Sequence, residues 1–285
     1  MTARLPDFVC IGALKAGTTY LEALLRDHPG LCLPSAVKEV DYFSLHHERG
    51  EQWYRDKFDG CAQRKHGEVS PRYLVDADSP ARIAAANADV RLLLLVRDPV
   101  TRAVSQYKHR VRTTFYRASF EDYLADNPGA LERGRYGHHA GRYLEWFDRA
   151  QLHVVVFEDL VADPVVAMRS VYGFLGVDAG HALSQHDRPH NEAWQPSRRR
   201  AYVLAKRLSG HVHDLGYGSV AFRLARSPLA VWVAGRHQQL DVSAPNEATA
   251  SRLRKHYAAD VDALSALVGR DLAELWWARQ PEPVA

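Results

Sequence analysis

Long apolar runs are missing from this sequence of 285 residues, and cysteine is scarce. The longest apolar runs, residues 92–96 and 229–234, are far too short to span a bilayer. No signal peptide is expected, because strand-like sequence begins by Phe8 after a single early arginine. The sequence has only three cysteines, Cys10, Cys32 and Cys61. This sparse, odd set fits free thiols in a reducing cytoplasm better than a disulfide scaffold, so we expect a cytoplasmic location.

Lysine is also scarce, with 7 residues against 30 arginines, and the formal net charge is only +3. So small a net charge argues against a nucleic-acid coat protein, because such binding depends on many phosphate contacts. Arginine suits bidentate recognition of phosphate or sulfate oxygens, although a solvated surface explains most of the 30. The fifteen histidines lack metal-site spacing, and the pair His138–His139 has no obvious carboxylate or cysteine partner. We therefore expect no metal site.

Short apolar runs alternate with helical patterns through the first two thirds of the chain. The strongest runs, residues 8–11, 91–96 and 152–157, are typical of strands buried in a parallel sheet. Helices are expected over residues 79–87, 98–112, 138–147, 163–175 and 248–268. The alternation predicts an α/β fold: a central, mostly parallel sheet of about four to five strands with helices on both faces. We expect one domain over residues 1–285, with an α/β core over 7–178 and a mainly helical C-terminal part over 179–285.

A glycine-containing turn joins the first strand to the first helix. Residues 12–19 read Gly-Ala-Leu-Lys-Ala-Gly-Thr-Thr, and we call them the P-loop-like segment. At such a turn, backbone N–H groups and the positive helix end converge on an anion, and Gly12 and Gly17 allow the backbone to approach it closely. Lys15 adds a mobile charge. The lysine precedes the second glycine, so this is not the NTP-binding signature. The segment predicts a nucleotide phosphate site, with an ordinary turn as the alternative.

A second strand ends in a cation where NTP-hydrolysing proteins often carry an Asp that helps hold Mg²⁺. The run at residues 92–96 leads straight into Arg97, whose forked guanidinium suits a second phosphate. Asp98 is explained as a helix N-cap, and Ser105 can add a hydroxyl from the helix that follows. The two segments together predict that the protein binds a nucleotide with an extra phosphate and that group transfer from this nucleotide needs no Mg²⁺.

These segments resemble the sulfotransferases that use 3′-phosphoadenosine 5′-phosphosulfate (PAPS), especially the branch with the heparan sulfate N- and O-sulfotransferase domains and many bacterial relatives. Residues 15–19 are similar to the family's 5′-phosphosulfate loop, and residues 95–107 to its 3′-phosphate segment. Residues 38–43, Lys-Glu-Val-Asp-Tyr-Phe, resemble the stretch whose glutamate is the family's catalytic base. Residues 158–177 resemble a further family stretch. The match covers roughly residues 7–178.

The resemblance implies a PAPS donor, the product adenosine 3′,5′-bisphosphate (PAP), and no metal. It implies Glu39 as the base and Lys15 as the group that stabilises the leaving phosphate. The implied nucleotide-binding residues are Lys15, Ala16, Gly17, Thr18, Thr19, Arg97 and Ser105, with Arg198, Arg199 and Arg200 from a stretch similar to a bacterial pattern. The implied acceptor is a hydroxyl, or less favourably an amine, of a carbohydrate, glycolipid or secondary metabolite.

The acceptor side departs from the heparan sulfate enzymes. Their second-strand motif has a lysine after its glutamate, and here that position is Val69, so their acceptor chemistry does not carry over with the donor site. Aromatic residues are candidates for the walls of the acceptor pocket, with core packing as the alternative: Trp53, Tyr54, Phe115, Tyr116 and Trp194.

Four other interpretations stay open at this point. Glu39 can form a surface ion pair with a neighbouring lysine or arginine, and His109 or His138–His139 can be the base instead. An ATP-dependent kinase would use the same anion loop but would need Mg²⁺ and an acidic ligand. A non-catalytic module that captures a sulfated glycan or nucleic acid would show steep salt dependence and no need for Glu39.

Overall fold

The computed structural model describes residues 5–61, 64–114, 116–184, 194–196, 237–239 and 245–278. Its contacts divide the chain into two units. One unit comprises Met1–Gln106, Ser119–Pro189 and Pro245–Ala285, and the other comprises Tyr107–Ala118 and His190–Ala244. The single-domain division with a boundary at residue 178 stays a prediction.

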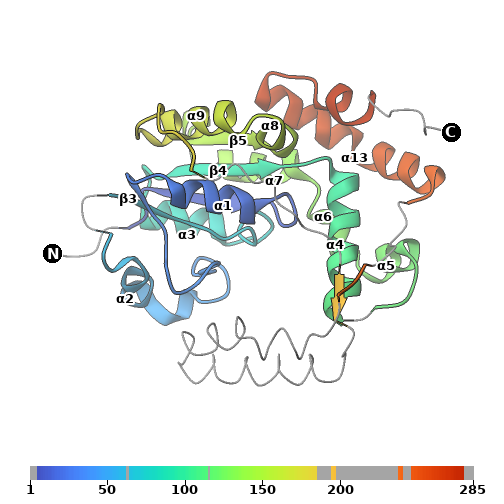
Figure 1. Cartoon of the computed structure of the whole chain (residues 1–285), viewed down its shortest axis with the longest axis horizontal. Coiled ribbons are helices and arrows are strands. Elements are labelled where there is room, and N and C mark those ends of the chain that lie inside the picture. Colours follow the sequence, from blue (N-terminus) through green and yellow to red (C-terminus); the bar gives the residue numbers. More distant parts are fainter. Residues whose placement is uncertain are drawn as a thin grey trace. The chain divides into compact units, whose positions relative to one another are not determined.

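A five-stranded parallel sheet forms the centre of the first unit (Figure 1). Its order is β2-β3-β1-β4-β5, and β1 pairs with β3 on one side and β4 on the other. The strands are β1 (Phe8–Gly12), β2 (Leu31–Cys32), β3 (Lys65–Val69), β4 (Arg91–Val96) and β5 (Leu152–Val156). Every residue of β1 is buried, as expected for a parallel strand covered on both faces. The predicted α/β fold is confirmed.

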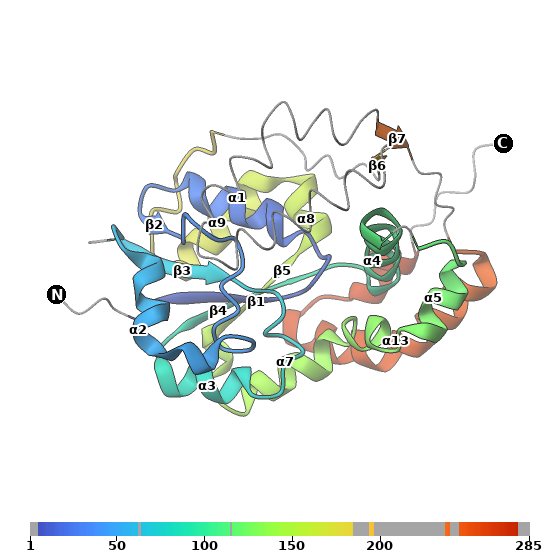
Figure 2. The same cartoon turned by 90° about the horizontal axis from the view of Figure 1, so that it is seen from below.

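Helices cover both faces of this sheet. Figure 2 shows α1, α8 and α9 on one side of the sheet and α3, α7 and α13 on the other. The helices are α1 (Thr18–Asp27), α2 (Gly50–Arg55), α3 (Ser79–Ala86), α4 (Pro99–Thr114), α5 (Phe120–Asp126), α6 (Gly129–Glu132), α7 (Tyr136–Leu144), α8 (Phe157–Ala162), α9 (Pro164–Leu175) and α13 (Glu247–Val268). After α13 a short π-helix, η4, spans Glu274–Ala278. Among the helices of the described ranges, none combines the length and apolar character that crossing a bilayer requires.

The second unit contains a short antiparallel pair of strands. β6 (Trp194–Pro196) pairs with β7 (His237–Gln239), with Trp194 opposite Gln239. In the same unit, Tyr107 Oη donates a hydrogen bond of 2.8 Å to the carbonyl of Ala118. This unit therefore has local structure of its own.

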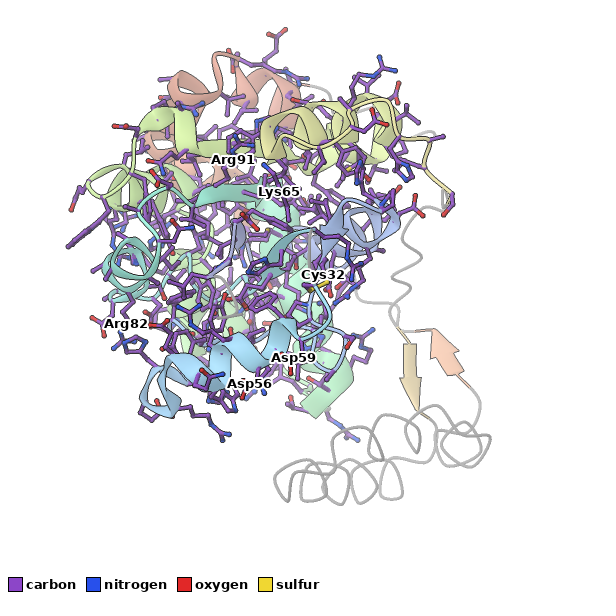
Figure 3. All side chains as sticks on the ribbon, turned by 90° about the vertical axis from the view of Figure 1, so that its left-hand side faces the viewer. Cys32, Asp56, Asp59, Lys65, Arg82 and Arg91 are labelled. Atoms are coloured by element: carbon purple, nitrogen blue, oxygen red, sulfur yellow. A yellow bond between two sulfur atoms is a disulfide. The ribbon has the colours of Figure 1, made fainter. Side chains whose placement is uncertain are left out.

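Two of the three cysteines form a disulfide, so the expectation of free thiols was wrong for them. Cys32 lies at the end of β2 and Cys61 lies before β3, with 5.6 Å between their Cα atoms. Figure 3 labels Cys32 and shows the bond between the two sulfur atoms. The sequence gives no sign of this pair because 29 residues separate its members, and it is parallel pairing of β2 with β3 that brings them together. Cys10 is free and buried in β1, as expected of a small core residue.

The carboxyl ends of β1, β3, β4 and β5 gather at one edge of the sheet. In open α/β sheets, ligands bind at this edge, where helices leave the sheet in opposite directions. The P-loop-like segment follows β1, Ser70 and Pro71 follow β3, and Arg97 follows β4. The fold therefore brings the two predicted phosphate sites to the same edge.

Candidate active site

The P-loop-like segment forms an anion-binding turn at the start of α1. Gly17 precedes the helix in the left-handed conformation, with φ of 103°, and Lys15 also has a positive φ, of 70°. The amide of Ala13 donates to the carbonyl of Leu95 at 2.7 Å, which fixes the segment to β4. The first amides of a helix have no partner within it, so those of Thr18 and Thr19 are available to an anion.

One aromatic ring connects the P-loop-like segment to Arg97. Phe157, the first residue of α8, lies so close to Gly17 that a Cβ atom there would come within 2.4 Å of its ring. The guanidinium of Arg97 lies over the same ring, 4.8 Å from its centroid. Both predicted phosphate sites therefore contact Phe157, on one side of the molecule. Sequence reasoning missed this residue, because an aromatic side chain at a strand end gives no signal of what it will contact.

Several side chains hold the turn between β4 and α4, which carries Arg97 and which we call the corner. Asp98 accepts hydrogen bonds from the amides of Val100 and Thr101, at 3.0 and 3.3 Å, which confirms it as the N-cap of α4. The amide of Asp98 donates to Glu158 Oε1 at 3.1 Å. Trp276 Nε1 donates to Glu158 at 3.0 Å, so a residue near the end of the chain supports this corner. Arg97 is thus presented from a fixed backbone.

Lys38 connects the candidate base to the start of α1. Its Nζ atom donates to Thr19 Oγ1 at 2.8 Å and lies 3.3 Å from Glu39 Oε1. The ion pair with a neighbouring lysine therefore exists, and it lies beside the P-loop-like segment. The Glu39 side chain keeps 33% of its surface exposed, so an acceptor can reach it.

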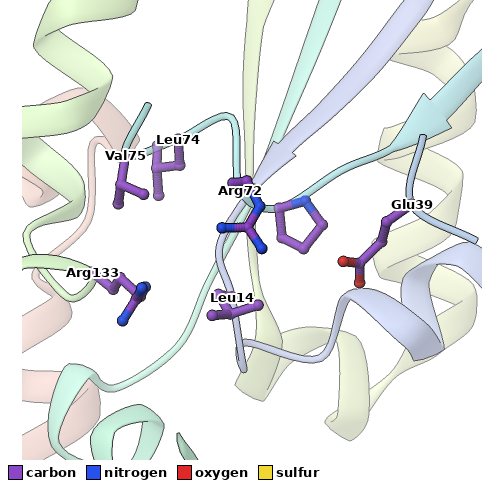
Figure 4. A pocket seen from close by; sticks show the side chains of 7 residues that line it. Leu14, Glu39, Arg72, Leu74, Val75 and Arg133 are labelled. Carbon is purple, nitrogen blue, oxygen red and sulfur yellow. The ribbon is translucent and has the colours of Figure 1, made fainter. Parts of the chain in front are cut away.

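A pocket next to Glu39 combines apolar and cationic walls. Its lining residues are Leu14, Glu39, Pro71, Arg72, Leu74, Val75 and Arg133. Figure 4 shows Glu39 and Arg133 on opposite sides of this pocket, with Arg72 between them. Burial and the neighbouring positive charges of Arg102 and Arg72 lower the pKa of Arg133, so an anion beside this guanidinium would be favoured. The pocket joins the candidate base to two cations.

A buried arginine of α4 bonds the segment that leads to Arg133. Arg102 is fully buried, donates to Gln106 Oε1 at 2.7 Å, and also bonds the carbonyl of Ala130. A buried guanidinium needs such partners, because an unpaired buried charge is costly. Arg102 therefore supports the segment that ends in Arg133.

Glu68, in β3 next to the pocket-lining segment, has a fully buried carboxylate. It accepts hydrogen bonds from the hydroxyls of Tyr54, Ser70 and Tyr73. Burial raises the pKa of Glu68 to about 7, against the lowering effect of these three hydrogen bonds. Tyr54 is thus a core residue, 0% exposed, as the core-packing alternative for it expected.

Glu68 makes the stability of the protein depend on pH. Its folded pKa, about 7, lies above the value of 4.5 expected in the unfolded chain. Between these values the folded state binds more protons, so this contribution to stability is present below pH 4.5 and is lost as pH rises through 7. At roughly 1.4 kcal/mol per pKa unit, the loss reaches up to about 3 kcal/mol. Denaturant unfolding at pH 5 and pH 8 should show wild type losing this amount relative to Glu68→Gln; an unchanged difference would contradict the assignment.

The histidine pair does have a carboxylate neighbour, contrary to the sequence-based expectation. Ligand atoms of Glu132, His138 and His139 lie within 4.8 Å of one another, on α6 and α7. Arg135 lies 3.2 Å from one carboxylate oxygen of Glu132, and Arg142 bonds His139 Nδ1 at 3.4 Å. Two guanidinium groups thus lie beside this cluster, and their charge opposes the binding of a cation.

The remaining predicted site residues either have a described position in the fold or lie outside the described side chains. Ser105 lies in α4, half-buried, eight residues after Arg97. Val69 is fully buried at the end of β3, so it does not replace the family lysine as a polar group. Several predicted residues lie outside the described side chains: Phe115, Trp194, Arg198, Arg199 and Arg200.

Comparison with known proteins gives one consistent result. A family model described as "Sulfotransferase domain" matches residues 5–195. Heparan sulfate glucosamine 3-O-sulfotransferase 3A1 of Mus musculus is 34% identical over 184 residues, which cover 61% of this chain and 46% of that protein. The 3B1 enzyme of Homo sapiens is 34% identical over 187 residues, covering 61% and 47%. The chain thus spans about half the length of these relatives. The solved sulfotransferase from Alicyclobacillus acidocaldarius has 26% identity and a TM-score of 0.66, covering 96% of this chain and 99% of that one.

Proposed function

This chain belongs to the sulfotransferase domain family, and we propose on that premise that it moves a sulfonate group from PAPS to a hydroxyl of an acidic carbohydrate. The observation that carries the proposal is the bridge from Thr19 through Lys38 to Glu39, which sets a carboxylate between the anion-binding turn and an open pocket. Family membership supports an enzyme of the sulfotransferase type over the kinase and the binding module.

The donor would lie along the edge of the sheet between the two cationic positions. We propose that Lys15 and the amides of Thr18 and Thr19 bind the 5′-phosphosulfate, and that Arg97 and Ser105 bind the 3′-phosphate. The shared contact of Gly17 and Arg97 with Phe157 supports this arrangement, because one nucleotide can reach both. Neither end of the donor needs a metal in this proposal.

The transfer is an in-line displacement at sulfur. The acceptor oxygen attacks sulfur as Glu39 takes the hydroxyl proton, and the bond from sulfur to the bridging oxygen of the phosphate breaks with its electron pair. Products are a sulfated acceptor, PAP and a protonated Glu39. In this proposal Lys15 and the turn amides stabilise the charge that develops on that oxygen, and donors oriented before reaction are the most effective form of electrostatic stabilisation.

The pocket supports an acceptor that has an apolar face and carries negative charge. Leu14, Leu74 and Val75 offer apolar contact, as the C–H face of a sugar ring would need. Arg72 and Arg133 supply two cations that suit carboxylate or sulfate groups. Arg72 is also paired with Asp41, at 3.5 Å, so Arg133 is the better probe of the acceptor.

Arg133→Ala is expected to raise the KM for heparan sulfate by about 10-fold or more, since a charge-assisted hydrogen bond contributes about 1.5–3 kcal/mol. The KM for 4-nitrophenyl β-glucoside, a neutral sugar, should not change. Transfer of radiolabelled sulfonate from PAPS measures both. Arg135→Ala is the matched control, because Arg135 pairs with Glu132 and does not line the pocket. An unchanged KM for heparan sulfate in Arg133→Ala would contradict the acidic acceptor, and wild type that modifies neither sugar would contradict a carbohydrate acceptor.

The cellular compartment stays a proposal. The sequence favours the cytoplasm, whereas a disulfide between Cys32 and Cys61 persists in oxidising surroundings. The redox state of this pair in protein taken from cells therefore decides between the two.

A further inference from the structure

A buried carboxylate lies among hydroxyl groups directly behind the residues that carry the candidate base. Glu68 accepts hydrogen bonds from Tyr54 Oη at 2.8 Å, Ser70 Oγ at 2.6 Å and Tyr73 Oη at 3.0 Å. None of these four residues lines the pocket beside Glu39. Contact with an acceptor therefore does not explain why the chain buries an ionisable group here, at a cost in stability.

Two of the three hydroxyls also hold the backbone of residues 38–43, which we call the base loop. Ser70 Oγ accepts hydrogen bonds from the amide N–H groups of Val40 and Asp41, at 3.1 and 3.2 Å. Tyr73 Oη accepts a hydrogen bond from the amide N–H of Phe43 at 3.2 Å. Ser70 and Tyr73 thus accept three amide hydrogen bonds of the base loop, the first of them one residue beyond Glu39, while Ser79 and Arg82 donate to the carbonyl of Phe43.

The direction of these bonds is set by Glu68. Above its pKa of about 7 Glu68 is ionised, and an ionised carboxylate only accepts hydrogen bonds, whereas a hydroxyl has one proton and two lone pairs. The single proton of Ser70 points to Glu68, so both of its lone pairs are left for the amides of Val40 and Asp41. The same holds for Tyr73 and Phe43. A neutral or donating group at position 68 would make at least one hydroxyl accept a hydrogen bond from it. That hydroxyl would then have one lone pair fewer for the amides of the base loop.

We propose that Glu68 is a positioning residue for Glu39: its buried carboxylate orients the hydroxyls of Ser70 and Tyr73 so that they hold the base loop in place for catalysis. The inference rests on the proposed role of Glu39 as the base. Glu68 does not touch the reacting atoms and acts through Ser70 and Tyr73.

Glu68→Gln tests this with almost no change of shape. The glutamine amide group brings N–H donors to a place where three hydroxyls donate, so one or more of them must reverse. The base loop should then lose hydrogen bonds while the P-loop-like segment and Arg97 are untouched. A displacement of about 1 Å at a catalytic group can cost about 100-fold in rate.

The tyrosines provide a matched pair of variants. Tyr54→Phe and Tyr73→Phe each remove one hydroxyl that donates to Glu68, and each keeps its buried ring. Only Tyr73 holds an amide of the base loop; within the described ranges Tyr54 Oη bonds Glu68 alone. Tyr73→Phe should therefore disturb the base loop at Phe43, and Tyr54→Phe should stay near wild type.

Three measurements on the full chain decide the question. At pH 8, where Glu68 is ionised, amide hydrogen exchange should become at least about tenfold faster at Val40, Asp41 and Phe43 in Glu68→Gln. In Tyr73→Phe it should become faster at Phe43, because Ser70 still accepts hydrogen bonds from the other two amides. The kcat for sulfonate transfer to heparan sulfate should fall by about 100-fold in both. The Kd of PAP, from calorimetry, should stay within about twofold of wild type.

The outcomes separate this inference from the proposed function. Normal exchange in the base loop of a folded Glu68→Gln would overturn it, as would equal effects of Tyr54→Phe and Tyr73→Phe. Where Glu68→Gln does not fold, the tyrosine pair alone decides. If wild type transfers nothing to heparan sulfate, the proposed acceptor fails, while the exchange pattern still tests the positioning role.

Discussion

Glu39→Gln is expected to lower kcat by about 10²–10⁴-fold while the Kd of PAP stays within about threefold of wild type. Glutamine fills the same space and can still bond Lys38, but it cannot take a proton from the acceptor hydroxyl. Glu39 lies 3.3 Å from Lys38 Nζ and lines the pocket, so it has the reach that a general base needs. The donor contacts proposed for Lys15, Thr18 and Arg97 do not involve this carboxylate, which is why binding and turnover should separate.

A control from the same region distinguishes this effect from a general loss of negative charge. Glu48 is exposed in the segment that follows the base loop, and Glu48→Gln should leave both kcat and PAP binding unchanged. Steady-state transfer from radiolabelled PAPS and calorimetry with PAP measure the two quantities. Normal turnover by Glu39→Gln would remove Glu39 as the base and would return His109 and His138–His139 to consideration.

Arg97→Ala is expected to weaken PAP binding by about 10–150-fold and to leave the binding of 5′-AMP within about threefold. The two ligands differ only by the 3′-phosphate, and a charge-assisted hydrogen bond to a phosphate contributes about 1.5–3 kcal/mol. Arg97 stacks on Phe157 and extends from a backbone that Glu158 and Asp98 hold, so its guanidinium is preorganised. Preorganisation of this kind increases what a contact contributes to binding.

The same titrations include a control for nonspecific attraction. Arg252 is exposed on α13, and Arg252→Ala removes one positive charge without touching the sheet edge. Its affinity for PAP should equal that of wild type. If Arg97→Ala weakens PAP and 5′-AMP equally, Arg97 does not read the 3′-phosphate, and the second cationic site has to be assigned elsewhere.

The sequence predicted those parts of the fold in which local pattern and tertiary role agree. The apolar runs at residues 8–11 and 91–96 became β1 and β4, and the turn after each became a candidate phosphate site. The register of buried parallel strands then brought Lys15 and Arg97 to the same edge, as expected. In contrast, β2 has two residues, Leu31–Cys32, which is too short to show a periodic pattern.

Side-chain contacts between elements far apart in the chain could not be predicted from the sequence. Phe157 was expected to end a strand, but it begins α8 and lies between Gly17 and Arg97. For Tyr54 the sequence left the pocket wall and core packing both open, and the structure places it in the core, where it stacks on Tyr42 with ring centroids 4.6 Å apart and bonds Glu68. Position along a strand or helix is readable from periodicity, but the direction in which an aromatic side chain finds a partner depends on elements far away in the sequence.

The measurement that tests the central claim most directly is calorimetric titration of the wild-type chain with PAP and with 5′-AMP, both in EDTA. One molecule of PAP per chain should bind, at least about tenfold more tightly than 5′-AMP, because the P-loop-like segment and Arg97 hold its two phosphates at one edge of the sheet. Equal affinity for the two nucleotides, or PAP binding that disappears in EDTA, would contradict the account.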